Sequence, residues 1–337
     1  MITIVTGAAG FIGFHVVQAL LARGDTVVGI DNLNDYYAPA LKLARLGQIA
    51  AGASFTFVQA DISDRAAIQA VFERHADATV VIHLAAQAGV RFSVIDPYAY
   101  VSANVMGHVV MLEAARRLPR LDHFVFASSS SVYGLNTAMP FAEDDRVDTP
   151  TSLYAATKRA DELIGHAFGH LFQLPQTGLR FFTVYGPWGR PDMAYYMFAR
   201  AIVNGEPISL YDGGRPRRDF TYIDDIVAGV LGAADRPPPA DAPLRLLNIG
   251  NNGSETVLRL IELLEAGLGR RAVIQLCPRP RADVADTFAN IDRIAALTGF
   301  TPATSFAEGI GRFIAWFADF HGVDLSHSVL DRAFGRD

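Results

Sequence analysis

The sequence predicts an α/β fold, a doubly wound parallel sheet with a smaller α/β domain towards the C-terminus. Apolar, β-branched runs alternate with helical stretches through the first half of the 337 residues, which is typical of a parallel sheet covered on both faces. After about residue 180 this alternation is lost, and the segments become shorter and richer in Arg, Pro and Gly. Half of the residues are hydrophobic, which is enough apolar material for a sizeable core.

The individual elements follow from hydrophobic period and from helix stop signals. The predicted strands are 2–7, 26–32, 54–61, 79–86, 123–131 and 178–187. The predicted helices are 12–24, 64–75, 103–118, 256–269 and 307–322. A further helix is predicted to begin in the stretch 152–164. The proline-rich stretch 236–243 reads as a loop.

Composition excludes several classes of protein. The net charge of -6 argues against nucleic acid as a partner, because such binding depends on clustered Lys and Arg. The single cysteine, Cys277, excludes a disulfide framework and a cysteine-based zinc site, and we interpret it as a small buried hydrophobe. The apolar N-terminus lacks a basic n-region, and no stretch reaches the ~18 uninterrupted apolar residues of a membrane span. We therefore expect a soluble, cytoplasmic protein with no membrane or metal site.

A glycine-rich loop, "TGAAGFIG", directly follows the first strand and directly precedes the first helix. It carries Gly7, Gly10 and Gly13. Glycines let the backbone turn sharply and approach a pyrophosphate, while the helix N-terminus offers amide donors. The loop therefore predicts a dinucleotide site in a Rossmann-type sheet, formed by residues 1–179 and 220–250. Residues 180–219 and 251–337 are expected to form an interleaved substrate domain.

Asp31 ends the second predicted strand, 18 residues after Gly13. A carboxylate here can accept both ribose hydroxyls of an adenosine and would repel the extra phosphate of NADP, so NAD is favoured. The structural alternative is that Asp31 merely caps a turn. Asp61 is a candidate for the adenine edge, and His83 reads as a core histidine. Further predicted cofactor contacts are Phe11, Ile12, Asn32, Ile62, Leu84, Ala85 and Ala86.

Tyr154 and Lys158 lie four residues apart in "SLYAATKRADELI" and therefore share one face of a helix. A free phenol has a pKa near ~10, but an ammonium about 4 Å away attracts the phenolate by roughly 4 kcal/mol at an effective dielectric of ~20. The pair is thus suited to remove a hydroxyl proton while hydride leaves the same carbon. Both residues are also predicted cofactor contacts.

Four serines, 128–131, follow the strand "FVFA". They are either an ordinary polar loop or hydroxyls at the carboxyl edge of a parallel strand, where ligands bind. In the second case one of them would hydrogen-bond the reacting oxygen beside Tyr154.

Taken together, "TGAAGFIG", Asp31, "SSSSVYG" and "YAATK" resemble the extended short-chain dehydrogenase/reductase superfamily, in family order over the first 160 residues. The resemblance implies that Ser129 is the hydroxyl partner and Tyr154 the base. It implies that Lys158 is the cation that stabilises the phenolate and holds the nicotinamide ribose. It also implies a homodimer through helices near 101–118 and 155–172.

Within that superfamily the sequence departs from the sugar-nucleotide dehydratases. Those enzymes carry an Asp-Glu pair where this chain has Ser130 and Ser131, so the acids that drive loss of water are missing. The stretches "DNLNDYYAPALKLARL" and "RFFTVYGPWGRPDMA" instead resemble UDP-glucuronate 4-epimerases. Galactose-type epimerases usually carry Asn where Thr183 stands. Ser129, Ser130 and Thr183 are therefore predicted substrate contacts.

Several residues are candidates for the anionic parts of such a substrate. Arg190 can grip a carboxylate through two parallel hydrogen bonds, although it could also be a surface arginine in a Pro-Gly loop. Arg91 is a second candidate. By the resemblance, Arg218 contacts the diphosphate. Asp283 is the residue retained from a family run near the uridine ribose, which here reads "RPRADV".

The sequence leaves alternatives open. The main hypothesis is an NAD-dependent epimerase of a UDP-sugar acid, UDP-glucuronate. A UDP-glucuronate decarboxylase shares the first step and differs in the fate of the carboxylate. A plainer alternative is an enzyme that epimerises a neutral UDP-hexose. A third hypothesis is a regulator that binds NAD without catalysing a reaction, and the presence of both Tyr154 and Lys158 argues against it.

Overall fold

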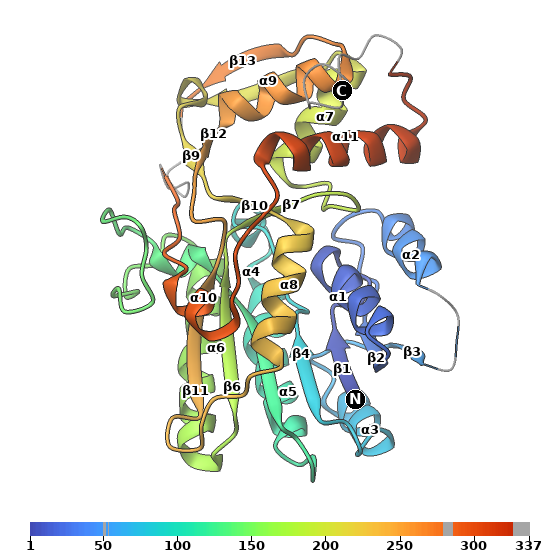
Figure 1. Cartoon of the computed structure of the whole chain (residues 1–337), viewed down its shortest axis with the longest axis vertical. Coiled ribbons are helices and arrows are strands. Elements are labelled where there is room, and N and C mark those ends of the chain that lie inside the picture. The colour runs from blue at the N-terminus through green and yellow to red at the C-terminus, as the bar shows by residue number, and fades with distance from the viewer. Residues whose placement is uncertain (50–51, 53, 279–285, 326–337) are drawn as a thin grey trace.

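A seven-stranded sheet forms the centre of the computed structural model, which describes residues 1–49, 52, 54–278 and 286–325 (Figure 1). The strand order is β11-β6-β5-β4-β1-β2-β3, and every neighbouring pair is parallel. The order reverses between β1 and β4, which places a crevice at the carboxyl ends of these strands. The bounds are β1 (Ile2–Thr6), β2 (Thr26–Asp31), β3 (Phe55–Gln59), β4 (Val80–His83), β5 (His123–Ser129), β6 (Gln176–Phe181) and β11 (Leu244–Ile249).

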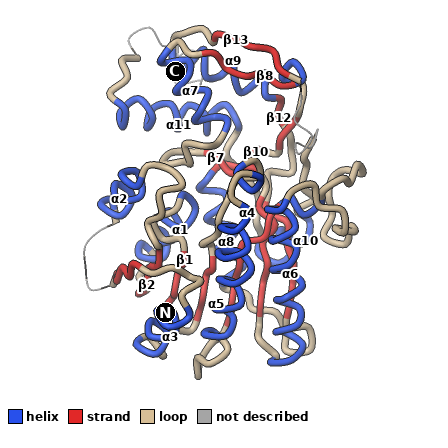
Figure 2. Tube along the Cα trace, turned by 180° about the vertical axis from the view of Figure 1, so that it is seen from behind, coloured by secondary structure: helices blue, strands red, loops and turns tan. Residues whose placement is uncertain are grey.

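Helices cover both faces of this sheet, so successive strand residues enter different cores. In β1, Val5 packs in the cluster that includes Phe14, whereas Ile4 packs in the cluster that includes Ile68. The first face carries α1 (Phe11–Ala22) and α8 (Ile223–Ala234), and the second carries α3 (Arg65–Arg74), α5 (Gly107–Ala115) and α6 (Leu153–Phe172) (Figures 1 and 2). The predicted doubly wound sheet is confirmed.

A smaller layer of helices and strands lies beyond the carboxyl edge of the sheet (Figures 1 and 2). Its helices are α7 (Ala194–Asn204), α9 (Val257–Leu268) and α11 (Phe306–His321), and β8 (Pro207–Tyr211) pairs in parallel with β13 (Val273–Cys277). The bounds of the linking elements are α2 (Pro39–Gln48), β9 (Arg217–Arg218), β10 (Phe220–Tyr222), β12 (Glu255–Thr256) and α10 (Asp292–Thr298).

The helix predicted over 103–118 is longer and less regular than expected. It begins with α4 (Pro97–Tyr100), passes through a π-helical turn at Val101–Met106 and continues as α5. The π-helical turn carries Asn104, which is 1% exposed. Its side-chain amide bonds the backbone N–H and C=O of Gln87 at 2.8 and 3.1 Å. The irregular turn thereby anchors the loop that follows β4.

The single strand predicted over 178–187 is wrong, because the chain changes partners in its middle. β6 ends at Phe181, and β7 (Thr183–Tyr185) pairs with β10 outside the main sheet. The Phe182 amide donates to the Ile249 carbonyl at 3.1 Å, whereas the Thr183 amide donates to the Asp219 carbonyl at 3.0 Å. This change of partner carries the chain from the sheet towards the smaller layer.

The expected domain boundaries remain a prediction. β6, α8 and β11 belong to the sheet and its covering layer, as the interleaved division requires, but α10 also packs on α8 and β11 although it lies in the range 251–337. Over the described residues, no helix combines the length and apolar character needed to cross a membrane.

Candidate active site

A cavity of about 430 Å³ lies at the carboxyl edge of the sheet. Loops after β1, β2, β4 and β5 form one part of its wall, and segments leading to the smaller layer form another. The cavity brings together nearly all of the residues predicted from sequence to bind cofactor or substrate. They are Gly7, Gly10, Phe11, Ile12, Gly13, Asp31, Asn32, Asp61, Ile62, Leu84, Ala85, Ala86, Ser129, Ser130, Tyr154, Lys158, Thr183, Arg190 and Arg218.

The glycine loop is too tightly packed for other residues. Gly7 has φ +70, and a Cβ there would lie 2.9 Å from the backbone nitrogen of Ala85. A Cβ on Gly13 would lie 2.0 Å from the Gly7 carbonyl oxygen. Gly10 is the N-cap of α1 and provides no side-chain cap, so the first amides of this helix are left for a ligand at the cavity wall. The loop therefore fits a pyrophosphate group.

Asp31 is 7% exposed and lies at the end of β2. Its carboxylate accepts the amide of Ala9 at 3.1 Å and that of Leu33 at 2.8 Å, and the Lys42 ammonium lies 4.0 Å away. The bond from Leu33 is the turn-capping contact considered above as an alternative to ribose binding. Because a carboxylate has about four lone-pair sites, this cap leaves room for a ribose hydroxyl at the cavity wall.

Asp61 is held by its neighbours. It accepts the Asn32 side-chain amide at 2.8 Å and both the amide and the hydroxyl of Ser63. Burial acts to raise the pKa of Asp61, but these hydrogen bonds outweigh it and lower the pKa. Asp61 therefore presents an ionised acceptor to the cavity.

Tyr154 and Lys158 lie one turn apart at the start of α6. Ser152 caps this helix by accepting the Ala155 amide at 3.1 Å. Lys158 is 4% exposed, and its Nζ donates to the Ala127 carbonyl of β5 at 3.0 Å and to Asp161 Oδ2 at 3.0 Å. The lysine is thus fixed against the sheet.

The four serines divide between two roles. Ser129 ends β5 and its Oγ accepts the Ser131 amide at 3.1 Å. Ser128 donates to Glu162 Oε1 at 2.7 Å, and Glu162 also binds the buried Arg180. Ser128 is therefore part of the packing between β5 and α6, although it lines the cavity together with Ser129, Ser130 and Ser131.

Arg190 lies in the loop after β7 and is paired with Asp192. Its Nε and Nη2 donate to the two carboxylate oxygens at 3.0 and 2.5 Å, and the Tyr36 hydroxyl donates to Asp192 Oδ2 at 3.0 Å. Burial raises the pKa of Asp192, but Arg190 outweighs this effect and the pKa is lowered. The guanidinium thus already holds a carboxylate through two nitrogens, and the residue lines the cavity.

Arg45 was missed by the sequence analysis. It is fully buried and donates to the carbonyls of Ala9, Trp188 and Gly189 and to the Tyr37 hydroxyl, at 2.7–3.1 Å. Arg45 thus connects the glycine loop to the loop that carries Arg190. Its spacing on a charged, amphipathic α2 resembles that of a surface arginine, so no sequence signal distinguished it.

The other predicted substrate residues are Arg218, which lines the cavity, Arg91 and Asp283. Arg218 lies on β9, where its Nη1 donates to the Arg217 carbonyl at 2.9 Å. Arg91 is not among the described residues that line the cavity, and its guanidinium lies 4.8 Å from the centre of the Tyr211 ring. Asp283 lies outside the described residues. Further cavity-wall residues not predicted from sequence include Tyr36, Lys42, Gln87 and Thr287.

The sheet order, the glycine loop and the Tyr154–Lys158 pair define an enzyme of the short-chain dehydrogenase/reductase superfamily. Comparison with known proteins narrows this class. The chain belongs to the NAD dependent epimerase/dehydratase family, whose model matches residues 3–250.

Three similar proteins are named after one activity. A "Probable UDP-glucuronate 4-epimerase" of Rhizobium meliloti is 45% identical over 329 residues, which are 93% of this chain and 96% of that protein. "UDP-glucuronate 4-epimerase 3" of Arabidopsis thaliana is 47% identical over 94% of this chain and 76% of its own length. A crystal structure of the UDP-glucuronic acid 4-epimerase from Bacillus cereus with UDP-glucuronic acid and NAD has a TM-score of 0.88. It is 33% identical and covers 95% of this chain and 100% of its own.

Proposed function

We propose that this protein is an NAD-dependent epimerase that converts UDP-glucuronate to UDP-galacturonate at C4 of the sugar. The observation that carries the proposal is Arg190, which lines the same cavity as the Tyr154–Lys158 pair and binds a carboxylate, that of Asp192, through two nitrogens. The relatives named after this activity, and the Bacillus cereus structure crystallised with UDP-glucuronic acid and NAD, support it.

In the proposed reaction Tyr154 takes the proton of the 4-hydroxyl, and Ser129 hydrogen-bonds the same oxygen. Lys158 stabilises the phenolate by its charge. NAD, when bound, accepts the hydride from C4 and returns it. The 4-keto sugar then rotates within the cavity, so that hydride returns to the other face of C4 and Tyr154 gives back the proton.

The cofactor would be held by this chain's own groups. The amides at the start of α1 would bind the pyrophosphate, and Asp31 would accept hydroxyls of the adenosine ribose. Asp61 would accept from the adenine edge. Because the cofactor ends each cycle in the state in which it began, the protein needs no external oxidant or reductant.

Arg190 accounts for the choice of an acidic sugar. Oxidation at C4 of glucuronate gives a β-keto acid, and such acids lose carbon dioxide when the carboxylate can turn perpendicular to the ketone. Two hydrogen bonds from a guanidinium hold the carboxylate in one plane. Thr183, Ser130 and Arg218 would contact the rest of the UDP-sugar.

The two alternatives fit less well. A UDP-glucuronate decarboxylase would gain from a loosely held carboxylate, whereas Arg190 is able to hold a carboxylate through two nitrogens, as it does with Asp192. A neutral UDP-hexose gives Arg190 no carboxylate to bind. The relatives named above also carry the name of the epimerase.

Two further properties belong to the proposal. We infer a cytoplasmic homodimer through α5 and α6 and the turn before α5. Exposed apolar side chains on these elements support that inference, and they are Met106, Leu163, Leu171 and Phe172, at 55%, 55%, 66% and 44% exposure. Sedimentation equilibrium should give twice the chain mass, and a monomer at micromolar concentration would contradict the dimer.

The test of the activity is incubation of the purified protein with UDP-glucuronate and no added reductant. We expect UDP-galacturonate of unchanged mass, separated by chromatography. A UDP-pentose with released carbon dioxide would replace the proposal with the decarboxylase. Conversion of UDP-glucose with no turnover of UDP-glucuronate would remove the role given to Arg190.

A further inference from the structure

Behind the Tyr154–Lys158 pair lies a group of buried titratable side chains that the proposed reaction does not use. Asp161, Glu162 and His108 are each 1% exposed, and His83 is 4% exposed. They come from α6, α5 and β4. Burying so many ionisable groups is costly unless each charge is paired, so the pairing of each decides what the group can do.

Three of the four are accounted for within the packing. Glu162 is bound by Arg180 on β6, at 2.8 Å, and by Arg159. Burial lowers the pKa of His108 to about 3, despite a hydrogen bond that the ring donates to the backbone of Asp161, so this ring is neutral. Burial also lowers the pKa of His83, whose Nδ1 lies 2.7 Å from the Thr6 hydroxyl. The histidine rings stack at 5.5 Å and carry no charge at neutral pH.

Asp161 differs from these groups, because its ion pair is with Lys158 itself. Its Oδ2 accepts from the Lys158 Nζ at 3.0 Å. Its Oδ1 is buried and has no hydrogen-bond partner among the described residues. The facing groups are thus Lys158 and Glu162 on α6, neutral His108 on α5 with His83 of β4 behind it, and Arg180 of β6 behind Glu162.

We propose that Asp161 is a positioning residue for the redox pair. Its buried carboxylate holds the Lys158 ammonium against β5 and offsets part of its positive charge, and thereby sets the pH range in which Tyr154 is deprotonated. Lys158 has one strong acceptor on each side, the Ala127 carbonyl and Asp161, so its direction is determined. The field that it exerts on the phenol is that of a partly neutralised cation.

Burial raises the pKa of Asp161 to about 6, against the opposing effect of Lys158, so its charge is present at neutral pH and is lost below it. As Asp161 takes up a proton, the ammonium acts on the phenol with its full charge and favours the phenolate. Loss of the carboxylate charge should therefore extend the working range of Tyr154 towards acid.

The direct test is titration of Tyr154 in the NAD-loaded protein. Phenolate absorbance is followed against pH in the wild type and in Asp161→Asn, and each curve is corrected with the same protein carrying Tyr154→Phe, which removes the other ten tyrosines from the signal. Asp161→Asn keeps an oxygen for the Lys158 Nζ and removes the charge. We expect its Tyr154 midpoint to fall by about one pH unit.

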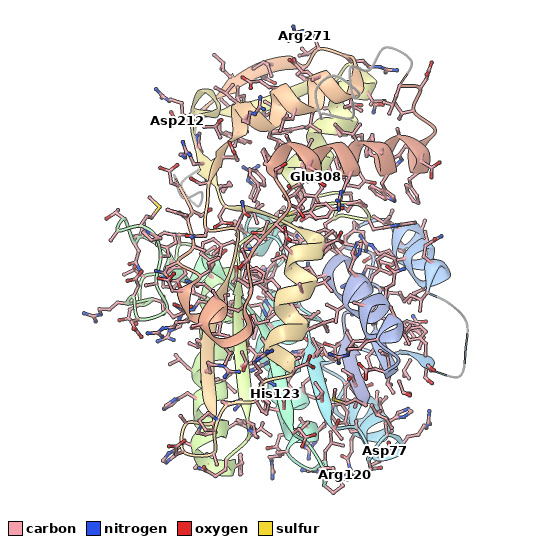
Figure 3. All side chains as sticks on the ribbon, in the orientation of Figure 1. Asp77, Arg120, His123, Asp212, Arg271 and Glu308 are labelled. Carbon is pink, nitrogen blue, oxygen red and sulfur yellow. The ribbon has the colours of Figure 1, made fainter. Side chains whose placement is uncertain are left out.

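The controls separate charge from structure. Asp77→Asn changes an exposed carboxylate at the far end of the sheet (Figure 3) and should leave the midpoint unchanged. Asp161→Glu keeps the charge and should retain the wild-type midpoint, and it tests the proposal even if Asp161→Asn does not fold. An unchanged midpoint in folded Asp161→Asn, or a lowered one in Asp161→Glu, would overturn the proposal.

A second readout uses turnover. The acidic limb of the kcat profile should move to lower pH in Asp161→Asn, with little change in KM, whereas a merely structural role would alter stability and leave the profile in place. The inference rests on the proposed function only in making Tyr154 the base. Because the titration needs no substrate, its result can be interpreted even if UDP-glucuronate is not the substrate.

Discussion

The two ends of the cavity are held in different ways. At the cofactor end, each group has a contact with backbone: Gly7 packs on the Ala85 backbone, and Lys158 donates to the Ala127 carbonyl as well as to Asp161. At the sugar end, Arg190 is fixed by side chains, through Asp192 and Tyr36. Backbone contacts leave a group little freedom, whereas an ion pair can exchange one carboxylate for another. The first end therefore suits a cofactor that stays, and the second a substrate that comes and goes.

Arg45 qualifies this contrast, because it belongs to both ends. It binds the carbonyl of Ala9 in the glycine loop and those of Trp188 and Gly189 beside Arg190. The spacing between the glycine loop and the loop that carries Arg190 thus depends on one buried guanidinium.

Tyr154→Phe removes the base at the cofactor end and should lower kcat by about 10³-fold, as the loss of general-base catalysis predicts. The cofactor contacts of the glycine loop and Asp31 are untouched, so NAD released on denaturation should stay stoichiometric. Tyr98→Phe, at a tyrosine that is 84% exposed, is the matched control and should remain active. A Tyr154→Phe variant that stays largely active would contradict the assignment of Tyr154 as the base.

Arg190→Lys keeps the charge at the sugar end but loses the planar pair of donors. We expect KM for UDP-glucuronate to rise by about tenfold to a hundredfold, the value of one charge-assisted hydrogen bond, and a pentose product to appear beside the epimer. Products are separated by chromatography and identified by mass. Arg215→Lys, at an exposed arginine of the neighbouring segment, should change neither quantity. An unchanged product ratio with unchanged KM would place the carboxylate elsewhere.

Arg45→Lys breaks the connection between the ends. A lysine cannot reach the four acceptors that Arg45 serves, so at least one buried carbonyl loses its donor, at a cost of about 1–3 kcal/mol in the free energy of unfolding. Urea unfolding measures this loss. If Arg45 sets the spacing, KM for the sugar should rise as well. A destabilised variant with wild-type KM would reduce Arg45 to a structural residue.

His123→Gln tests a region outside both ends, since His123 lies at the opposite end of the sheet (Figure 3). Burial lowers its pKa to about 4, although a hydrogen bond with the Ala234 carbonyl opposes this. Below the unfolded value of 6.5 the unfolded chain binds a proton that the folded one does not. Its stabilising contribution is therefore complete above pH 6.5 and is lost as the pH falls towards 4.

Between pH 7.5 and 5, the wild type should lose about 1–2 kcal/mol of unfolding free energy through this residue alone. His123→Gln should lose that much less over the same interval in urea unfolding, while kcat at neutral pH stays unchanged. The exposed His166→Gln should retain the full loss. Equal losses in all three proteins would show that His123 does not titrate as its burial implies.

Sequence reasoning could predict the cofactor end because its signals are local. The loop from Gly7 to Gly13 and the four-residue spacing of Tyr154 and Lys158 each lie within one strand–helix junction, where period and turn chemistry determine geometry. The doubly wound parallel sheet followed from the same alternation. The prediction of one strand over 178–187 failed at Phe182, where the chain exchanges Ile249 for Asp219 as its partner, because such a change depends on distant segments.

The sugar end and the support behind Lys158 depend on contacts between segments far apart in the chain. Arg190 was predicted from its place after a turn, but the Tyr36 hydroxyl that bonds its partner Asp192 is 156 residues away from that aspartate. Arg45 likewise bonds Trp188, which is 143 residues away in the chain. Arg91 is oriented towards Tyr211 by packing of the same kind. Asp161 is three residues from Lys158, yet only its burial distinguishes it from a surface ion pair on a helix.

If one hydride leaves C4 and returns to the same carbon, UDP-glucuronate that carries deuterium at C4 should keep its label through the reaction. The protein is incubated with this substrate in ordinary water, and the product is examined by mass and by NMR. We expect UDP-galacturonate that keeps its deuterium at C4. Solvent hydrogen at C4, or a pentose product in place of the epimer, would contradict it.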